Sequence, residues 1–384
     1  QRALPTIQLL ARKQAKIVII AHLGRPQAPD LKKSLLPVAV HLAEMLQYKF
    51  LELENDVVRL PHYAMPHVFF IPEDFRTPRV KKLLSELNPR DVAVLENLRF
   101  YPEENQGEVK FARALANLAD IYVNDAFASS YDKRASVYLL PRLLPHYAGL
   151  ELEQEISVLS RILARPARPY VALVGGIKLS DKFSGLSGLL EKVDYACVGG
   201  GLASLFFLAQ GYEVGKSALD SEGKSQAADL LRNYQDKIVL PVDLVVARSL
   251  QEPETLRVTL PEKVRRHEMI LDIGPSTIKK FSTYLRKAKT IIWSGPLGMF
   301  EVREFSHGTK ALGMLVAARS QGPAFGVAGG GNTLEAIKLI KMGSYFDFLS
   351  NGGSSMLQFL TGQKLPALKV LSEAPSKNAL EPFS

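Results

Sequence analysis

Short runs of β-branched and aromatic residues alternate with longer amphipathic segments along the whole chain. The runs predict strands, and the longer segments, which include residues 110–119, 183–193 and 225–234, predict helices. Strands that alternate with helices form βαβ units, so the sequence predicts an α/β fold with mostly parallel sheets and helices on both faces. The predicted strands are residues 16–20, 92–95, 121–123, 170–174, 237–240, 290–293 and 324–327.

The length of the chain predicts two domains. Its 384 residues, 47% of them hydrophobic, exceed what one compact core usually serves. A helix-like stretch over residues 151–163 ends before Pro166 and Pro169, which is typical of a connector. We therefore expect two doubly wound, parallel-sheet (Rossmann-like) domains joined by a helix hinge. The domains are residues 1–150 and 170–355, the hinge is residues 151–169, and a carboxyl-terminal segment, residues 356–384, is hypothesised to return to the first domain.

The residues that follow the predicted strands differ between the two halves. Ligands of parallel sheets bind beyond the carboxyl ends of the strands, so these residues are candidates for a site. In the first half they include the cationic or polar residues His22, Arg25 and Arg99. In the second half they are glycine clusters, whose backbone N–H groups can approach phosphate oxygens closely. The clusters are Gly175-Gly176, Gly199-Gly200-Gly201, Asp272-Ile273-Gly274-Pro275, Ser294-Gly295-Pro296, Gly329-Gly330-Gly331-Asn332 and Asn351-Gly352-Gly353-Ser354.

Two lysines, Lys178 and Lys182, follow one of these clusters where a strand passes into a helix. They are four residues apart, so one helix face can present both to the same phosphates. Plainer interpretations exist for each feature: a single Gly-Gly pair is more often only a turn, a lysine pair is often a solvated face, and Arg99 alone fits a structural salt bridge equally well. The combination favours a phosphate site.

Two familiar nucleotide-binding motifs are incomplete. Residues 211–217 look like a P-loop, but three residues separate Gly211 from Gly215 where that motif needs four. No Gly-x-Gly-x-x-Gly follows a predicted strand with a suitably placed acidic residue, so the signature of a dinucleotide-binding dehydrogenase is missing. A phosphate site in this chain must be built in another way.

Composition limits the classes of partner and the cellular compartment that we expect for this chain. A net charge of +9 and a pI near 9.4 suit nucleic acid or phosphorylated metabolites, but the basic runs are short and lack interleaved aromatic residues. Cys197 is the single cysteine, which excludes an internal disulfide framework and fits a reducing cytoplasm. The longest uncharged stretch, residues 195–212, is interrupted by glycines, so we expect no membrane span, and we expect no signal peptide.

These features together resemble the phosphoglycerate kinase family, and the matching motifs run in order over nearly the whole chain. The incomplete P-loop is one of them and is similar to a non-P-loop element of that family. The matches include residues 3–7 (Ala-Leu-Pro-Thr-Ile), 22–26 (His-Leu-Gly-Arg-Pro), 34–39, 95–100 (Leu-Glu-Asn-Leu-Arg-Phe), 122–127, 175–182, 198–201, 211–217, 240–243, 272–275, 293–298, 300–301 and 329–331.

The resemblance implies an enzyme of glycolysis, a kinase that transfers a phosphoryl group reversibly between 1,3-bisphosphoglycerate with ADP and 3-phosphoglycerate with ATP. It implies Mg²⁺ bound to the nucleotide, hinge bending, and a cytoplasmic monomer without nucleic-acid or membrane partners. Phosphoglycerate would be held in the first domain by His22, Leu23, Gly24, Arg25, Arg99 and Arg134. The catalytic residues would be Lys178, Gly352 and Gly353. The nucleotide would be bound by Lys182, Gly199, Gly200, Glu301, Gly329, Gly330, Gly331, Asn332 and Thr333, with Asn332 as a weak metal ligand.

The sequence departs from the family inside several motifs. Asp132 holds the position of a substrate-binding arginine, which Lys133 or Arg134 would replace in a reshaped loop; a loop that has lost this role is the alternative. Asn332 holds the position of an aspartate, and offers Mg²⁺ an oxygen without its charge. Asn332 with Glu335 also fits a helix-capping box. Further departures are Ser294, Ser354 and, at a position of the family's adenine pocket, Ile270. The family's opening strand and a catalytic arginine would precede Gln1, so we expect the native amino terminus upstream.

Three hypotheses follow from these residues. The first is a working phosphoglycerate kinase, because the lysines, arginines, His22 and Glu301 of the motifs are retained. The second is a nucleotide-binding relative with weak or no transfer activity, motivated by Asp132 and Asn332. The third is nucleic-acid binding through a basic surface, which rests on the pI alone.

Overall fold

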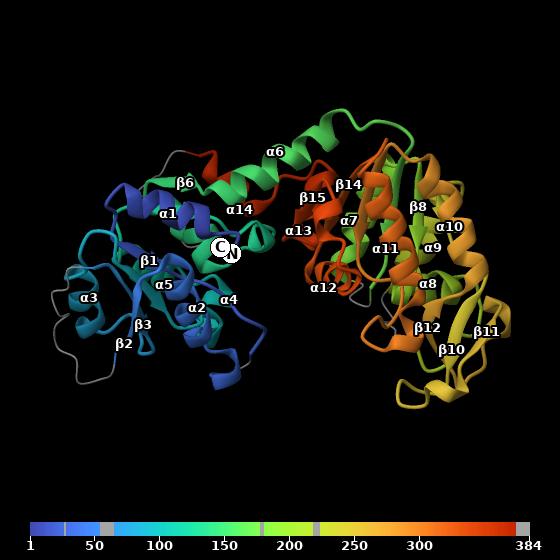
Figure 1. The fold of residues 1–384 in the computed structure, drawn as a ribbon, viewed down its shortest axis with the longest axis horizontal. Helices are drawn as coiled ribbons and strands as arrows, with labels where there is room; N and C mark the ends of the chain where they lie inside the picture. Colours follow the sequence, from blue (N-terminus) through green and yellow to red (C-terminus); the bar gives the residue numbers. More distant parts are fainter. Residues whose placement is uncertain (27, 54–64, 177–179, 218–222, 374–384) are drawn as a thin grey trace. The chain divides into compact units, whose positions relative to one another are not determined.

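The structure is a computed structural model, and it describes residues 1–26, 28–53, 65–176, 180–217 and 223–373. The chain divides into two compact units (Figure 1). The first contains Gln1–Gln154 and Leu365–Ser384, and the second contains Glu155–Lys364. The boundary between Gln154 and Glu155 lies inside helix α6 (Leu150–Ala164), which covers the helix-like stretch of residues 151–163.

The first unit is built on a parallel sheet of order β1-β4-β3-β2, with a separate parallel pair β5-β6. Alternate residues of each strand face opposite sides, so the sheet buries two clusters of apolar side chains, one against α1 and α2 and the other against α3 and α5. The strands are β1 (Ile17–Ile19), β2 (Lys49–Glu52), β3 (His67–Ile71), β4 (Val92–Leu95), β5 (Tyr122–Asn124) and β6 (His146–Ala148). The helices are α1 (Leu4–Arg12), α2 (Leu36–Leu46), α3 (Pro78–Ser85), α4 (Pro102–Gln106), α5 (Val109–Ala116) and α14 (Pro366–Leu371).

The carboxyl-terminal helix α14 packs within the first unit. The backbone N–H of Ala367 donates to Ser130 O at 3.1 Å, and His146 Nε2 lies 2.9 Å from Glu373 O. These contacts attach the end of the described chain to segments more than two hundred residues earlier in the sequence.

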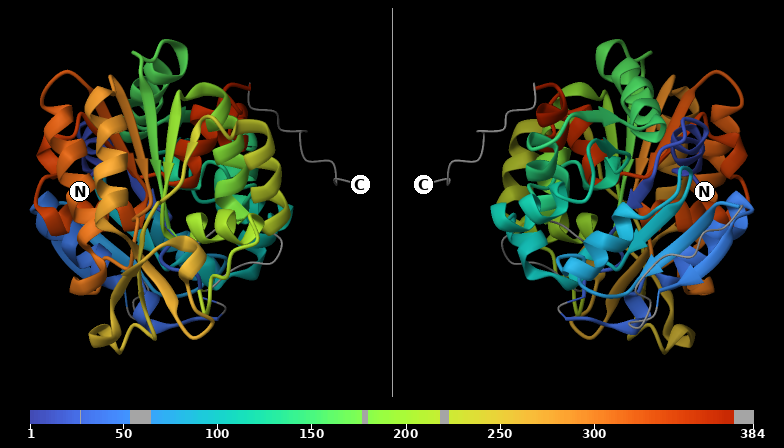
Figure 2. Two further views of the ribbon diagram at one scale, coloured as in Figure 1. Left: turned by 90° about the vertical axis from the view of Figure 1, so that its right-hand side faces the viewer. Right: turned by 90° about the vertical axis from the view of Figure 1, so that its left-hand side faces the viewer.

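The second unit contains a six-stranded parallel sheet of order β15-β14-β13-β7-β8-β9. From β9 to β15 the strands follow the order 3-2-1-4-5-6 in the unit's own sequence, which is the doubly wound arrangement with its switch point between β7 and β13. Helices α10 and α11 lie on one side of this sheet and α8 and α9 on the other (Figure 2, left). The strands are β7 (Tyr170–Val174), β8 (Tyr195–Val198), β9 (Ile238–Val239), β13 (Thr290–Ser294), β14 (Phe325–Gly329) and β15 (Phe348–Ser350). The helices are α7 (Ser180–Lys192), α8 (Gly200–Ala209), α9 (Gly223–Tyr234), α10 (Pro275–Lys287), α11 (His307–Ser320), α12 (Gly331–Ile340) and α13 (Ser354–Leu360).

A small antiparallel sheet joins the second unit and was not predicted from the sequence. It consists of β10 (Leu244–Ala247), β11 (Arg257–Thr259) and β12 (Met269–Ile273), in the order β11-β10-β12. The prediction of an α/β fold with mostly parallel sheets is confirmed, and each strand predicted from the sequence overlaps an observed one.

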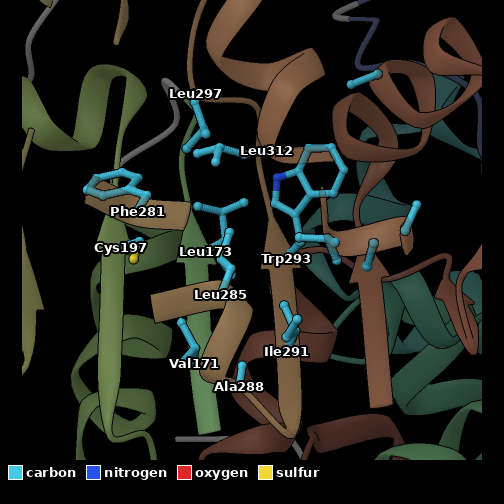
Figure 3. Packing of buried hydrophobic residues seen from close by; sticks show 14 of the residues in the cluster. Val171, Leu173, Cys197, Phe281, Leu285, Ala288, Ile291, Trp293, Leu297 and Leu312 are labelled. Atoms are coloured by element: carbon cyan, nitrogen blue, oxygen red, sulfur yellow. The ribbon is translucent and has the colours of Figure 1, made fainter. Parts of the chain in front are cut away.

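The core of the second unit surrounds Trp293, which is fully buried on β13. Figure 3 shows its indole beside Leu312, in a cluster that also contains Leu173 of the sheet and, farther from the indole, Phe281. The indole Nε1 donates to Gly295 O at 2.9 Å, so the core residue also fixes the turn that follows the strand. Packing of β13 and the geometry of its carboxyl end are thereby linked.

Candidate functional site

Glycine clusters meet at the switch point of the second unit. The backbone N–H of Gly175, after β7, donates to Ser294 O at the end of β13 at 2.9 Å. Gly200 has φ +60°, and a Cβ atom there would lie 2.8 Å from Gly176 N and 3.0 Å from Pro296 O. Residues with a side chain are therefore excluded at this point by conformation and by contact. The result is a rim of backbone groups, the kind of surface that approaches phosphate closely.

Two further glycine pairs lie side by side at the neighbouring strands β14 and β15. A Cβ on Gly329 would lie 2.7 Å from Gly352 O, and one on Gly330 would lie 3.1 Å from Gly353 Cα. Thr333 ties this rim to the switch point, because its buried hydroxyl accepts from the Gly295 N–H at 2.8 Å and donates to Gly329 O at 2.9 Å. The structure thus brings the predicted glycines of β14 and β15 together.

A cavity of about 240 Å³ opens beside this rim. Three predicted nucleotide residues, Gly200, Glu301 and Asn332, line it. Its other walls are largely apolar and come from the antiparallel sheet and the segment after β13: Leu244, Leu250, Met269, Ile270, Leu271, Ile273, Leu297 and Met299. A concave apolar space with a few polar groups and a backbone rim suits a small ligand that has both an apolar and an anionic part.

Asp272 of β12 lies at the cavity and is 1% exposed. Its carboxylate accepts hydrogen bonds from the backbone N–H groups of Ile273 and Gly308, both at 2.8 Å. Burial raises the pKa of Asp272 from 3.8 to about 7, and the backbone hydrogen bonds offset only part of that effect. A carboxyl group that titrates near neutrality therefore lies in the wall of the cavity.

No individual role was predicted for Asp272 or Ser217, although each lies in a motif noted in the sequence. Ser217 ends the segment that resembled a P-loop; its hydroxyl accepts from the Ile270 N–H at 3.0 Å and donates to Val214 O at 2.6 Å. Two features of the sequence could have indicated them. Asp272 is an acidic residue in an otherwise apolar run before Gly274-Pro275, and Ser217 follows the glycine-containing segment that begins at Gly211.

Several predictions for the second unit fall outside this geometry or need correction. Lys178 lies outside the described residues, and Lys182 lies in α7 at a position whose side chain is outside them. Asn332 is in the first turn of α12, whose N-cap is Gly330, so the capping-box interpretation of Asn332 is wrong. Ile270 lines the cavity, Ser294 is buried at the end of β13, and Ser354 begins α13.

The possible metal ligands near the cavity show how the Mg²⁺ that the resemblance implies could be bound. Among the residues that the structure describes, no group of three or more His, Cys, Asp or Glu side chains could hold a metal ion. Asn332 contributes a single amide as a candidate oxygen ligand at the cavity. This set fits Mg²⁺ that arrives on nucleotide phosphates and does not fit a cage built from protein ligands alone.

In the first unit, three arginines form a cationic group. Arg99 follows β4 in a 3₁₀ turn, and its Nη1 donates to Gly24 O. Burial lowers the pKa of Arg99, and the positive charges of Arg134 and Arg25 lower it further, while Asp132 opposes them. Arg134 Nη2 pairs with Asp132 Oδ2 at 2.8 Å. The predicted residues Gly24, Arg25, Arg99 and Arg134 are therefore close enough to act on one anion.

Buried polar residues hold this group in place. Asn97 is fully buried; its amide donates to Leu23 O at 2.8 Å, and its oxygen accepts from the Leu23 and Arg99 N–H groups at 3.2 and 3.1 Å. His22 Nε2 lies 2.8 Å from Oε1 of Glu104, which is also fully buried. These links join the loop after β1 to the loop after β4, and they were not predicted from the sequence.

Asp125, in the motif of residues 122–127, has a structural contact. Its Oδ1 accepts from the backbone N–H groups of Glu151 and Leu152 at 3.0 and 3.1 Å, at the start of α6. A carboxylate at a helix amino terminus satisfies N–H groups that have no intrahelical partner. Helix capping accounts for its Oδ1, whereas its buried Oδ2 has no hydrogen-bond partner among the residues that the structure describes.

Comparisons with known proteins agree over most of the chain. The family model described as phosphoglycerate kinase matches residues 1–363. A curated phosphoglycerate kinase from Pelotomaculum thermopropionicum is 37% identical over 375 residues, which cover 97% of this chain and 90% of the relative. One from Aquifex aeolicus is 36% identical over 375 residues, with coverage of 97% and 89%.

Solved structures give the same result. The phosphoglycerate kinase of Coxiella burnetii superposes with a TM-score of 0.72 at 34% identity, and that of Pyrococcus horikoshii with 0.79 at 28% identity. Each match covers 97% of this chain and 90% of the solved chain. Within the described part of the chain, no helix is both long and apolar enough to span a bilayer.

Proposed function

The chain belongs to the phosphoglycerate kinase family, and on that premise we propose that it transfers a phosphoryl group reversibly between 1,3-bisphosphoglycerate with ADP and 3-phosphoglycerate with ATP. The observation that carries this proposal is the cavity at the switch point of the second unit. Its apolar walls suit a nucleoside, and the glycine rim beside it suits phosphates.

Nucleotide binding is assigned to residues around that cavity. We propose that Glu301 accepts from the ribose hydroxyls and that Gly199, Gly200 and Gly329–Gly331 form a rim without side chains against which the phosphates lie. The N–H groups of Gly199, Gly200 and Gly330 donate to Val174 O, Leu297 O and Ser350 O, which fixes the shape of this rim. Thr333 would keep the two glycine rims in register through its hydroxyl. Lys182 would contact nucleotide phosphates, and Asn332 would place an amide oxygen near nucleotide-bound Mg²⁺, which supplies charge neutralisation at the phosphates when bound.

Binding of the acid is assigned to the arginine group of the first unit. Planar guanidinium groups match carboxylate and phosphate geometry, and the charges of Arg25 and Arg134 both act on Arg99. His22, Leu23 and Gly24 would complete this site, since Asn97 fixes their loop beside Arg99. Positively charged groups that are held before substrate arrives lose little conformational entropy on binding.

The chemical step needs positioning and charge stabilisation, with no covalent intermediate on the protein. We assign Lys178 the neutralisation of negative charge on the transferring group, and Gly353 backbone donation to it. Gly352 would position this donor, because its own N–H donates to Ser350 Oγ at 3.1 Å. Hydrogen-bond donors that are fixed where charge develops lower the barrier because they need not reorganise during the reaction.

We also propose the organisation that the sequence suggested. Residues 1–150 would bind the acid, residues 170–355 the nucleotide, and residues 151–169 would act as a hinge in a cytoplasmic monomer. Of the carboxyl-terminal segment, residues 356–384, the part from Leu365 onward would return to the first domain, whereas the part up to Lys364 groups with the second unit. Helix α6, which contains the boundary between the two units, and the contacts of α14 support this assignment. A smaller radius of gyration by X-ray scattering with both substrates bound, and a monomer mass by sedimentation, are the expected results.

The test is MgATP-dependent phosphorylation of 3-phosphoglycerate by the full-length protein. Turnover should be lost in Lys178→Ala and Arg99→Ala, and retained in Lys192→Ala, an exposed lysine at the far end of α7. Asn332→Asp should keep or raise the rate. Tight MgADP binding with no turnover in the wild-type protein and in Asn332→Asp would instead identify a nucleotide-binding relative.

A further inference from the structure

We propose that Asp132 is an internal counter-ion of the arginine group in the first unit, and that it sets how tightly this group binds an anionic substrate. The inference depends on the proposed function only for the identity of the substrate, phosphoglycerate. The charge arrangement on which it stands is independent of that identity.

The arginine group has hydrogen-bonding capacity that the protein leaves unused. Arg99 Nε and Arg134 Nη1 are buried, and neither has a hydrogen-bond partner among the residues that the structure describes. Buried donors of charged groups are costly to leave unsatisfied. Two such atoms on two arginines that repel each other indicate a place for an anion from outside the protein.

Asp132 already supplies one negative charge to this group. Its Oδ2 lies 2.8 Å from Arg134 Nη2, and the two side chains are only 22% and 14% exposed. Asp132 also raises the pKa of Arg99, which opposes the combined effect of burial and of the other two arginines. Its carboxylate thus interacts electrostatically with at least two of the three guanidinium groups.

Charge balance gives the direction of the effect. Three guanidinium groups and one carboxylate leave a net charge of about +2, whereas phosphoglycerate carries about three negative charges near neutral pH. A carboxylate beside the site repels that ligand and occupies a donor that the ligand would otherwise use. Removing its charge without changing its shape should therefore strengthen anion binding.

A purely structural role of Asp132 predicts the opposite change in anion affinity. If Asp132 served mainly to hold Arg134 in position, its loss would release Arg134 and weaken anion binding. Arg134 Nη1 is buried apart from this ion pair, so packing of the guanidinium does not depend on Asp132 alone. This is why we assign Asp132 to charge balance.

The experiment is calorimetric binding of 3-phosphoglycerate, and separately of inorganic phosphate, to the full-length protein and its Asp132→Asn variant. The matched control is Asp74→Asn, because Asp74 pairs with Arg76 at the same spacing of two residues at 2.6 Å, outside the arginine group. Asp132→Asn should bind 3-phosphoglycerate roughly tenfold more tightly, which corresponds to about 1.4 kcal/mol, and Asp74→Asn should match the wild type.

The outcomes separate this inference from the proposed function. Unchanged or weaker binding by Asp132→Asn, in a protein whose wild type binds 3-phosphoglycerate, overturns the inference and leaves the function standing. Tighter binding of phosphate by the variant, with no binding of 3-phosphoglycerate by either protein, supports the counter-ion and refutes the substrate. Loss of both ligands in Arg99→Ala locates the binding at the arginine group.

Discussion

The carboxylate of Asp272 on β12 accepts the backbone N–H of Gly308 at 2.8 Å and so attaches the first turn of α11 to the wall of the cavity. The same carboxyl lies against Gly298, in the segment that leads to Glu301. One buried group therefore positions two segments that border the proposed nucleotide site. We expect Asp272→Asn, which replaces one acceptor by a donor, to raise the KM for MgATP several-fold and to leave that for 3-phosphoglycerate unchanged.

Asp272 also predicts a pH dependence of stability. Its pKa is about 7 in the folded protein and near 3.8 when unfolded, so the folded state binds more protons between these values. The free energy of unfolding should therefore fall by up to about 1.4 kcal/mol per pH unit as the pH rises from about 4 to about 7. Urea unfolding at several pH values should show this slope in the wild type and a smaller one in Asp272→Asn.

Asp243 provides the matched control for that measurement. It accepts from the N–H groups of Ser276 and Thr277 at the start of α10 and is not one of the residues that line the cavity. Burial raises the pKa of Asp243, but these hydrogen bonds together outweigh it and lower the pKa. The stability that ionised Asp243 contributes is lost only as the pH falls through that low pKa. Asp243→Asn should therefore leave the pH dependence of the unfolding free energy between pH 5 and 7 as in the wild type. An identical slope in all three proteins would contradict the assignment to Asp272.

Gly200→Ala should impair nucleotide binding more than stability alone explains. A Cβ there must adopt φ +60° and lie 2.8 Å from Gly176 N, so the rim at the switch point has to shift. Gly211→Ala is the control, because Gly211 has φ +88° but no atom within 4 Å of the added Cβ. Both variants should lose about 1 kcal/mol of stability from backbone strain, with Gly200→Ala losing more. Only Gly200→Ala should raise the KM for MgATP, and equal values for the two would count against a phosphate rim.

Part of the parallel sheets was predictable, because local pattern and tertiary environment agree there, whereas β2, β3 and β15 were not predicted as strands. The apolar run over residues 170–174 coincides with β7, since a strand buried on both faces needs no alternation and Gly175 ends it. The glycines after residues 170–174, 290–293 and 324–327 were predictable for the same reason. Gly352 and Gly353 follow β15, which was not among the predicted strands. Residue pairs across the rims, such as Gly330 with Gly353, were not predictable, because their contact depends on the order of β14 and β15 in the sheet.

The antiparallel sheet and Asp272 show where local pattern fails. Strands β10 and β12 pair with each other although a long segment separates them in the sequence, and their register shifts between Val245 and Val246. The sequence therefore contains no tight hairpin turn that would have indicated this pair. Asp272 reads as an interruption of an apolar strand, and its partner Gly308 is 36 residues away. Its buried position is intelligible only once α11 lies beside β12.

Thr333→Val should weaken the link between the two glycine rims. The change keeps the shape of the side chain but leaves the Gly295 N–H and the Gly329 C=O without their partner, at a cost of about 1–3 kcal/mol. Thr290→Val removes a comparable buried hydroxyl, bonded to Ala167 O at 2.8 Å at the other end of β13. Both variants should lower the urea midpoint, but only Thr333→Val should lower affinity for MgADP in calorimetry. A drop in affinity of the same size in both would point to general loosening of the sheet.

Trp293, the only tryptophan in the chain, should report unfolding of the second unit. Its indole is buried in the core of that unit, so its emission should shift to longer wavelength only when this core opens (Figure 3). A ligand that binds the native state alone stabilises it by about 2.7 kcal/mol at one hundred times its Kd. MgADP at that excess should therefore raise the urea midpoint seen by Trp293 emission, because the proposed nucleotide cavity lies in the same unit. Glu301→Ala should reduce this shift without moving the midpoint of the free protein, and an unchanged midpoint with MgADP in the wild type would argue against nucleotide binding in the second unit.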